Sequence, residues 1–311
     1  MKTIDPSEIK ILVCCHKKCE LPPNPDGIFL PIHVGAAISK DNMGMQRDDQ
    51  VNGEPCDNIS DKNKNFCELT ALYWAWKNIK KIYPNIKYIG LNHYRRYFDF
   101  AVNDTFKDLK IRKESEISSY SLNTVRLNNF LQQGNCILAK KNIYFYPIYI
   151  DYCINHISDD YRLLKTIIQK TAPDYARSFY YIFNVNNKLS PFNMFITTYE
   201  EFEKYCDWLF SILFEVEKAK SLEGYSSVQA RIYGYMAERL FNVYIYHNNI
   251  KKTFLPIEWY NDVAVEKKNS FYKSIYNIKC NISSFVFYLC TASLGVLLSN
   301  ISFLLKKKKL K

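Results

Sequence analysis

The chain has 311 residues, of which 48% are hydrophobic and 16% aromatic. These fractions exclude a disordered or fibrous protein and leave room for one large domain or two modest ones. The formal net charge is +11, but the C-terminal KKKKLK carries five of these charges. The remaining cations are scattered, which favours an anionic small molecule or membrane surface over nucleic acid as the partner.

The ten cysteines do not indicate a metal site. None of them forms a CxxC pair, and no second cluster has the spacing of zinc ligands. Most lie within apolar patterns, where cysteine behaves as a small hydrophobic residue. The N-terminal MKTIDPSEIK also lacks the apolar region of a secretory signal. We therefore expect reduced thiols in a cytosolic setting.

The first elements of the chain predict an α/β unit. The runs at residues 9–15 (IKILVCC) and 29–34 are short and apolar, as buried strands are. Residues 39–60 form a polar connection that is too long for an ordinary loop, which is typical of functional segments. A helix is predicted to begin at Ser60 and to end before Pro84, and it leads into the strand of KYIGLNHYRRYFDF. This order predicts parallel strand pairing.

The second half of the sequence predicts further elements of the same kind. A strand is expected at residues 136–139, helical structure over residues 150–185, and a short strand after Ser190-Pro191. Two capping boxes predict the starts of two more helices: Thr198 with Glu201, and Ser226 with Gln229.

Residues 282–305 contain no charged side chain. As a helix they would measure roughly 36 Å, enough to cross a bilayer core. We expect a hydrophobic C-terminal helix that anchors the chain in or on a membrane; a buried amphipathic helix is the alternative. The predicted organisation is a catalytic domain at 1–262, a basic linker at 263–281, the hydrophobic segment at 282–305 and a polybasic tail at 306–311.

Two predicted strands end in cations, and ligands of open α/β sheets bind at such carboxyl ends. The first strand is followed by His16 and Lys17, and the second by His93, Arg95 and Arg96. Guanidinium groups and helix N-termini bind phosphate well, so a diphosphate-bearing donor fits this edge. The alternative is a strand end whose cations pair with nearby acids. The polar loop and the start of the helix supply the other candidate donor-binding residues: Asp48, Asp49, Asp57, Asn58, Ser60 and Asn63.

Several blocks of the sequence together resemble one family. They read IKILVCCHK, PIHVGAA, DNISDKNKNFCELTALYWAWKN, YIGLNHYRRYF, NMFITTYEEFEKYCDWLF and ARIYGYMAERL, and they run from residue 9 to about residue 245. The set resembles a bacterial glycosyltransferase family of capsular and exopolysaccharide gene clusters, catalogued as a domain of unknown function, with galactofuranosyltransferase-type members. The hydrophobic C-terminal segment lies outside the resemblance.

The resemblance implies a GT-A-like fold, a mixed sheet flanked by helices, that transfers sugar from a nucleotide-sugar donor. Many such enzymes hold a divalent metal with an Asp-x-Asp motif, whereas the equivalent strand end here reads His93-Tyr94-Arg95-Arg96. If the alignment holds, side-chain cations replace the metal in stabilising the departing diphosphate. The pair Asp48-Asp49 either holds a metal or lies in a solvated loop, so metal dependence stays open.

An inverting transfer also needs a carboxylate base for the acceptor hydroxyl. Glu238 is the first candidate, because Arg231, Tyr235 and Glu238 are spaced to share one helix face. A surface ion pair is the alternative role for Glu238, and Glu68 and Asp57 are alternative bases. Two further residues are candidates for the acceptor side, Asn193 and Met194, with simple packing as the alternative for Met194.

These observations predict a glycosyltransferase on the cytoplasmic side of the cell membrane. Its donor is expected to be a UDP-sugar, such as a galactofuranose or another hexose donor, and its acceptor a lipid-linked glycan. The alternative is a non-catalytic, basic, membrane-associated module that binds polyanionic glycan or nucleic acid. A phosphotransferase is disfavoured, because the sequence has no GxxxxGK[ST] phosphate loop.

Overall fold

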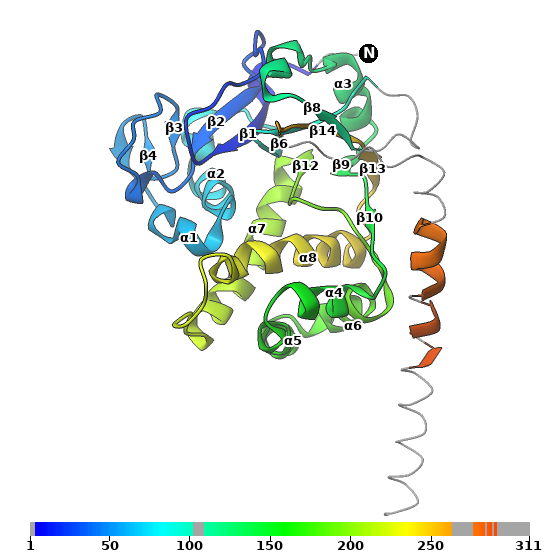
Figure 1. Cartoon of the computed structure of the whole chain (residues 1–311). Helices are drawn as coiled ribbons and strands as arrows, with labels where there is room; N and C mark the ends of the chain where they lie inside the picture. The colour runs from blue at the N-terminus through cyan, green and yellow to red at the C-terminus, as the bar shows by residue number, and fades with distance from the viewer. Residues whose placement is uncertain (1–3, 102–108, 263–275, 284, 288, 291–311) are drawn as a thin grey trace, which may run out of the picture.

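The computed structural model of the chain describes residues 4–101, 109–262, 276–283, 285–287 and 289–290 (Figure 1). Three buried runs pair in its main sheet: β1 (Ile9–Cys15), β2 (Phe29–His33) and β6 (Tyr88–His93). β1 lies between the other two and is parallel to both. The predicted unit of strand, loop, helix and strand with parallel pairing is therefore confirmed.

The remainder of the sheet is mixed. β12 (Phe195–Thr198) runs antiparallel to β6 and to β9 (Cys136–Ala139), and β13 (Lys252–Leu255) is parallel to β9. The strand order is β13-β9-β12-β6-β1-β2-β3, with β3 at Gln46–Arg47. Except for β12, the strands of this path share one direction, so their carboxyl ends meet at one edge of the sheet.

A hairpin extends the sheet beyond this edge. β6 turns into β7 (Arg96–Phe98), which pairs with β14 (Ile257–Tyr260), and β14 pairs in parallel with β8 (Lys110–Arg112). Four short strands form two separate ribbons: β4 (Gln50–Val51) with β5 (Glu54–Pro55), and β10 (Asn142–Ile143) with β11 (Lys188–Leu189). Through this hairpin, β14 lies close to the end of β6, although the two strands are more than 140 positions apart in the sequence.

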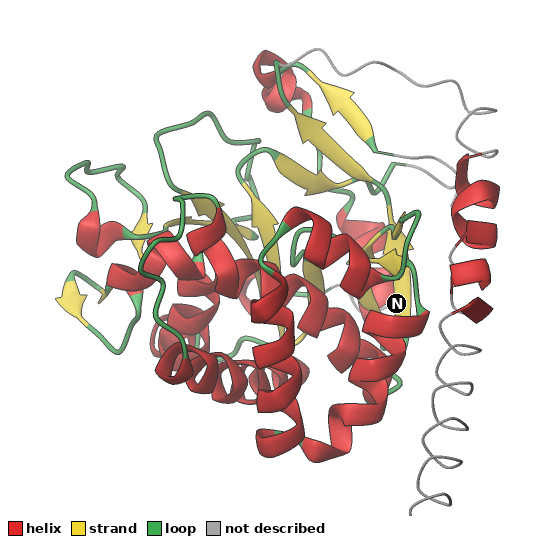
Figure 2. Ribbon diagram, turned by 60° about the horizontal axis from the view of Figure 1, so that its bottom comes forward, coloured by secondary structure: helices red, strands yellow, loops and turns green. Residues whose placement is uncertain are grey.

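Alternate side chains of β1 enter two different cores. Leu12 and Cys14 face the larger helical layer, and Ile11 and Val13 face the opposite side. The larger layer contains α1 (Asn63–Phe66), α2 (Leu69–Ile82), α4 (Ile148–Asn155), α5 (Ser158–Thr171), α6 (Ala176–Tyr180), α7 (Tyr199–Ala219) and α8 (Ile232–His247) (Figure 2). The opposite core is covered by α3 (Thr124–Gln132) and η4 (Glu114–Ser119). Covering both faces explains why β1 is apolar along its whole length.

Short helical turns complete the order of elements. They are η1 (Pro6–Glu8), η2 (Ala36–Ile38), η3 (Ser60–Lys62), η5 (Pro173–Tyr175), the π-helix η6 (Tyr181–Val185) and η7 (Gln229–Arg231). The capping box at Thr198 is confirmed, because its hydroxyl accepts a hydrogen bond from the Glu201 N–H at the start of α7.

The single helix predicted from Ser60 is wrong in one respect. The chain forms η3 and α1 and then breaks at Cys67, whose φ is +53°, before α2 begins. A left-handed residue cannot continue a right-handed helix, and a cysteine there is strained. Residues 150–185 are likewise divided into α4, α5, α6 and flanking turns. In both places tertiary contacts override a helical pattern that looked continuous.

Near the C-terminus, residues 276–283, 285–287 and 289–290 are helical. Within the described ranges, none of the helices is both long and apolar enough to cross a membrane. Most of the predicted hydrophobic segment, residues 291–305, lies outside the described residues, as does the polybasic tail. The long hydrophobic C-terminal helix is thus not found among the described residues.

Candidate active site at the β6–β7 hairpin

The stretch KYIGLNHYRRYFDF forms a tight hairpin at the carboxyl edge of the sheet. His93 at the end of β6 pairs with Arg96 at the start of β7, which leaves Tyr94 and Arg95 at the tip. The Tyr94 N–H donates to the Cys14 carbonyl at 3.2 Å and ties the tip to the end of β1. The cations therefore take different directions: His93 and Arg96 lie across from each other, and Arg95 projects from the turn.

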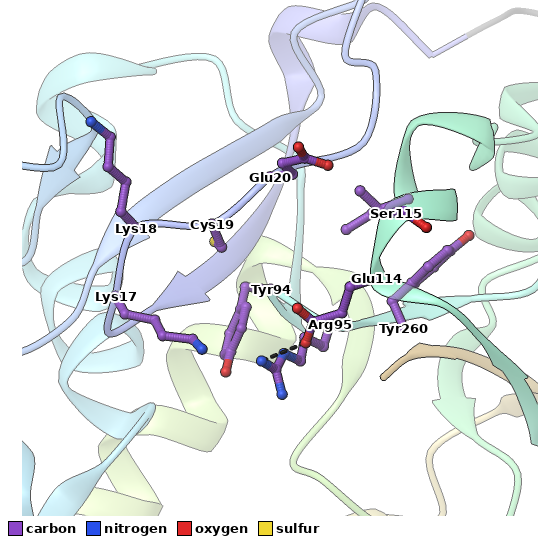
Figure 3. A pocket seen from close by; sticks show the side chains of 10 residues that line it. Lys17, Lys18, Cys19, Glu20, Tyr94, Arg95, Glu114, Ser115 and Tyr260 are labelled. Atoms are coloured by element: carbon purple, nitrogen blue, oxygen red, sulfur yellow. Dashed lines mark ion pairs between the residues drawn. The ribbon is translucent and has the colours of Figure 1, made fainter. Parts of the chain in front are cut away.

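One side of the tip borders a cavity of about 330 Å³. Figure 3 shows the Tyr94 ring between the side chains of Lys17 and Arg95, while Lys18 points away from them. The Lys17 ammonium lies 5.9 Å from the ring centroid and the Arg95 guanidinium 5.0 Å from it. The His16 ring meets the same tyrosine edge-on at 5.2 Å. The structure thus brings together three of the predicted cationic residues around one aromatic ring.

Charge in this cavity is only partly compensated. Arg95 forms an ion pair with Glu114 of η4, and its Nε is buried without a hydrogen-bond partner. Burial lowers the pKa of His16, and the nearby charges of Lys17, Arg231 and Arg95 lower it further. The lining also includes Lys18 and a second carboxylate, Glu20, so three cations face two carboxylates. This excess of positive charge suits an anion with more than one charge.

His93 lies on the other side of the hairpin and is held as a neutral ring. Its Nε2 lies 2.7 Å from the carbonyl oxygen of Phe192. Because a carbonyl oxygen only accepts, Nε2 is the protonated nitrogen. Burial lowers the pKa of His93, and Arg96 acts in the same direction while Glu68 opposes both. His93 therefore serves as a hydrogen-bond donor near neutral pH.

Arg96 is fixed between two aromatic rings. Its guanidinium lies 4.4 Å from the Phe192 ring centroid and 4.8 Å from that of Trp259 in β14. Among the described residues it has no ion-pair partner, and its buried Nε makes no hydrogen bond. Burial lowers the pKa of Arg96, while the charges of Glu68 and Glu238 oppose this. The rings hold the guanidinium in place and leave its donors for a ligand.

A strained turn before β12 connects this cation to two carboxylates. Phe192 and Asn193 have left-handed φ angles of +74° and +54°. The Phe192 N–H donates to Glu238 Oε1 at 2.6 Å, and Asn193 Nδ2 donates to Glu68 Oε1 at 2.7 Å. Asn193 is only 2% exposed, and its Oδ1 has no partner. Backbone strain beside an unsatisfied buried acceptor is typical of a functional site.

The two carboxylates differ in how fully they are engaged. Glu238 of α8 accepts from the Phe192 N–H and also pairs through Oε2 with Arg239 at 2.9 Å. Burial raises the pKa of Glu238, and Arg239 opposes that rise. Glu68 lies at the N-cap of α2, and no described residue hydrogen-bonds its Oε2. Glu68 therefore keeps one oxygen for a substrate, whereas Glu238 holds the turn.

The other predicted acceptor residues take different positions. The Arg231 guanidinium lies 5.7 Å from the Tyr235 ring centroid and donates through Nε to Cys67 Sγ at 3.2 Å. Tyr235 also stacks on His156, with the ring centroids 4.0 Å apart. Met194 is fully buried in the core on the α3 side of the sheet. Packing is therefore the role that its position supports.

Asp48 is a structural anchor of the long loop. It is completely buried and accepts hydrogen bonds from the N–H groups of Gly35 (2.8 Å) and Ala36 (3.0 Å) and from the Ser60 hydroxyl. The Ser60 oxygen in turn accepts from the Ala37 N–H. Both carboxylate oxygens of Asp48 therefore bind protein donors.

Asp49 pairs with Arg47, with 2.6 Å between Nη2 and Oδ2. Within the part of the chain that the structure describes, no group of three or more His, Cys, Asp or Glu side chains is arranged to hold a metal ion. The pair Asp48-Asp49 is therefore divided between two local networks.

The remaining loop candidates also bond locally. Asp57 accepts from the Tyr73 hydroxyl at 3.1 Å, and Asn58 accepts from the Ser60 N–H. Asn63 donates to the Cys67 carbonyl. Its side chain lies against Gly35, where an added Cβ would be 2.8 Å from the Asn63 Cβ, so glycine is required there. A donor-binding role for these residues stays a prediction.

The fold is that of an α/β protein with cationic side chains gathered beside a cavity at the carboxyl edge of a mixed sheet. The chain belongs to the family described as a domain of unknown function, DUF4422, which matches residues 10–249. The resemblance seen in the sequence blocks is thereby confirmed. No curated protein matches the chain.

The chain is also similar to a solved structure described as the apo form of the bifunctional glycosyltransferase WbbM. The two share 28% sequence identity with a TM-score of 0.70. The similarity covers 84% of this chain and 48% of that one. The present chain thus spans about half the length of the bifunctional protein.

Proposed function

We propose that the chain is a glycosyltransferase, which moves a sugar from a nucleotide-sugar donor to a glycan acceptor. The similarity to a glycosyltransferase over 84% of the chain supports this class. The observation that carries the proposal is the set of cations at the hairpin. Lys17 and Arg95 flank the Tyr94 ring, and Arg96 lies against the rings of Phe192 and Trp259. A leaving diphosphate needs such preorganised positive charge.

The donor diphosphate binds at the cavity beside the tip. In the ligand-free chain, Glu114 pairs with Arg95 there. A diphosphate carries more negative charge than one carboxylate, so it displaces Glu114 and recruits Lys17. Arg96, on the other side of the hairpin, adds a further positive charge, and His93 holds the turn beside it by donating its one N–H to the Phe192 carbonyl. A divalent metal remains compatible with this arrangement, and adding manganese or a chelator tests its use.

The transfer itself forms one bond and breaks one. The acceptor hydroxyl oxygen attacks the anomeric carbon, and the bond from that carbon to the diphosphate oxygen breaks. The nucleoside diphosphate leaves with the electron pair, and the hydroxyl proton passes to a carboxylate. Glu68 is the better placed base, because its Oε2 binds no described residue and Glu238 is engaged at both oxygens. Asn193 Oδ1 is the free acceptor for a second substrate hydroxyl.

The finer identity of the substrates follows the expectations from the sequence. We propose a UDP-sugar donor, carrying galactofuranose or another hexose, and a lipid-linked polysaccharide acceptor. The uncharged segment at 282–305 and the lysines after it would hold the chain on the cytoplasmic side of the membrane, where such acceptors lie. Arg231 and Tyr235, at the start of α8, are proposed to line the acceptor side.

The direct test is an activity panel with the purified full chain. UDP-, GDP-, CMP- and dTDP-sugars are each incubated with membrane acceptor, with and without manganese, and both transfer and donor hydrolysis are measured. We expect turnover with UDP-sugars. If none of the donors is transferred or hydrolysed under any condition, the proposed function is wrong.

A further inference from the structure

Three lysines gather at the far end of the sheet from the hairpin, and we call them the lysine cluster: Lys141, Lys188 and Lys252. Lys188 pairs with Ile143 in the β10–β11 ribbon, and Lys141 immediately precedes that ribbon. Partial burial lowers the pKa of Lys141, and repulsion from Lys252 and then Lys188 lowers it further. No ion pair among the described residues involves any of the three. This surface therefore carries uncompensated positive charge.

Exposed aromatic side chains continue from the same ribbon. Phe145 and Tyr146, which follow β10, are 41% and 37% exposed, although both are large and apolar. Their rings contact each other, with centroids 5.0 Å apart. Large apolar side chains beside clustered amines are unusual on a soluble surface and typical of an interaction site.

The C-terminal helical segment, residues 276–283, 285–287 and 289–290, lies against this ribbon (Figure 1). Asn187 donates to the Cys280 carbonyl at 3.3 Å, and the rings of Tyr146 and Phe287 are 6.4 Å apart. The segment nevertheless leaves a row of apolar side chains 47–62% exposed: Tyr276, Ile278, Ile282, Phe285, Val286 and Leu289. The ribbon and the helical segment that packs on it thus both expose apolar side chains.

The sequence beyond this surface indicates what covers it. From residue 291 to residue 305 the chain has no charged side chain, and four consecutive lysines follow. A second copy of the chain is a poor partner, because a symmetric contact would place like charges against each other. Anionic lipid headgroups complement the lysines, and the acyl boundary accepts the aromatic rings.

We propose that Phe145, Tyr146, the lysine cluster and the exposed face of the C-terminal helical segment form a docking surface for an anionic phospholipid bilayer. The inference rests on the membrane association in the proposed function, but it does not depend on the sugar-transfer reaction. It adds that the folded body, and not only the C-terminal tail, contacts the lipid. The docked surface fixes how the domain is oriented toward a lipid-linked acceptor.

A tryptophan reporter on the full chain tests this contact. The test variant is Phe145→Trp, and the control is Val228→Trp. Val228 is also exposed (60%), but it lies before the N-terminus of α8 and outside the proposed docking surface. With vesicles of phosphatidylcholine and phosphatidylglycerol, we expect the reporter at position 145 to shift its emission to the blue and to be quenched by brominated lipid. The control reporter should do neither. The parent chain, with its four native tryptophans, supplies the background.

Neutralising the lysines tests the electrostatic part. Lys141→Gln, Lys188→Gln and Lys252→Gln together should lower partitioning onto anionic vesicles by about a hundredfold, since each lysine near such a surface contributes roughly fivefold. If the C-terminal tail keeps the triple variant bound to the vesicles, the weaker docking appears instead as reduced quenching of the tryptophan at position 145 by brominated lipid. The matched control removes three charges from α1 and α2 through Lys64→Gln, Lys80→Gln and Lys81→Gln, and it should change neither quantity.

Two results overturn the inference. One is a vesicle-bound chain whose reporter at position 145 stays exposed to water, because the tail alone would then make the contact. The other is a full chain that does not bind the anionic vesicles. Donor hydrolysis, measured in detergent on the same variants, separates these results from failure of the proposed function, since the docking variants should hydrolyse donor at the parent rate.

Discussion

The β6–β7 hairpin and the long loop at residues 39–60 both carry charged side chains but use them differently. In the loop, Asp48 binds three protein donors and Asp49 binds Arg47, so the charges hold the backbone. At the hairpin, Arg96 is supported by aromatic rings and has no carboxylate partner among the residues that the structure describes. A charged segment becomes a binding site only where the fold leaves its donors or acceptors unsatisfied.

Removing the hairpin cation should have the largest effect. In Arg96→Ala we expect kcat/KM for transfer to fall roughly 10²–10³-fold, as when one preorganised donor to the transition-state charge is lost. Arg96→Lys keeps the charge but loses the planar stacking, so its activity should lie between that of the parent chain and that of Arg96→Ala. Thermal unfolding of both variants checks that the fold survives. A loss of only a few fold would show that Arg96 does not stabilise the leaving diphosphate.

Replacing Glu68 tests which of the two carboxylates, Glu68 or Glu238, is the base. Glu68→Gln should lower kcat roughly 10²-fold, because the proton acceptor is gone. Glu238→Gln serves as the comparison. Its amide oxygen still accepts from the Phe192 N–H, so a loss of about tenfold or less is expected. The opposite ranking of the two variants would return the base to Glu238, the residue that the helix-face pattern favoured.

In the loop the same kind of change should affect stability more than turnover. Asp48→Asn should cost about 2 kcal/mol of unfolding free energy, since a buried charged acceptor of three hydrogen bonds is replaced. Asp49→Asn should cost about 1 kcal/mol or less, because its ion pair is partly exposed. Urea unfolding measures both. A stable Asp48→Asn chain that no longer binds donor would show that the loop contacts the ligand directly.

A separate, pH-dependent effect concerns His156, which stacks on Tyr235. Burial lowers the pKa of His156 to about 4 from its ordinary 6.5. Between these values the unfolded chain binds a proton that the folded chain excludes, so stability falls as the pH drops through this window. After allowance for solvent screening, the loss is about 1 to 2 kcal/mol. His156→Gln should remove this part of the pH dependence, and an unchanged pH–stability curve would contradict the assignment.

The central strands and the sheet edge at which the candidate site lies could be predicted from the sequence, because buried strands leave local patterns. The run at Ile9–Cys15 and the cations after it needed no tertiary information. The partners of the hairpin cations Arg95 and Arg96, in contrast, could not be predicted without tertiary information. Trp259 and Glu114 have no pattern that links them to the hairpin, and pairing through β14 and packing of η4 bring them there.

Other differences between prediction and structure have the same origin. The left-handed turn at Phe192-Asn193 and the break at Cys67 depend on contacts that local propensity does not record. Met194 looked like part of a binding block but points into the core. Asp48 and Ser60 hydrogen-bond each other, which the sequence did not indicate, and their donor-binding role stays a prediction.

Calorimetric titration of UDP into the full chain and into Arg95→Gln tests the central claim most directly, because Arg95 lines the cavity without forming part of the core. If the cations at the hairpin tip receive a diphosphate, the variant should bind UDP roughly 10 to 100 times more weakly, as expected when a charge-assisted contact is lost. The parent affinity should also weaken as salt is added. Equal affinities of the two chains for UDP would contradict the account.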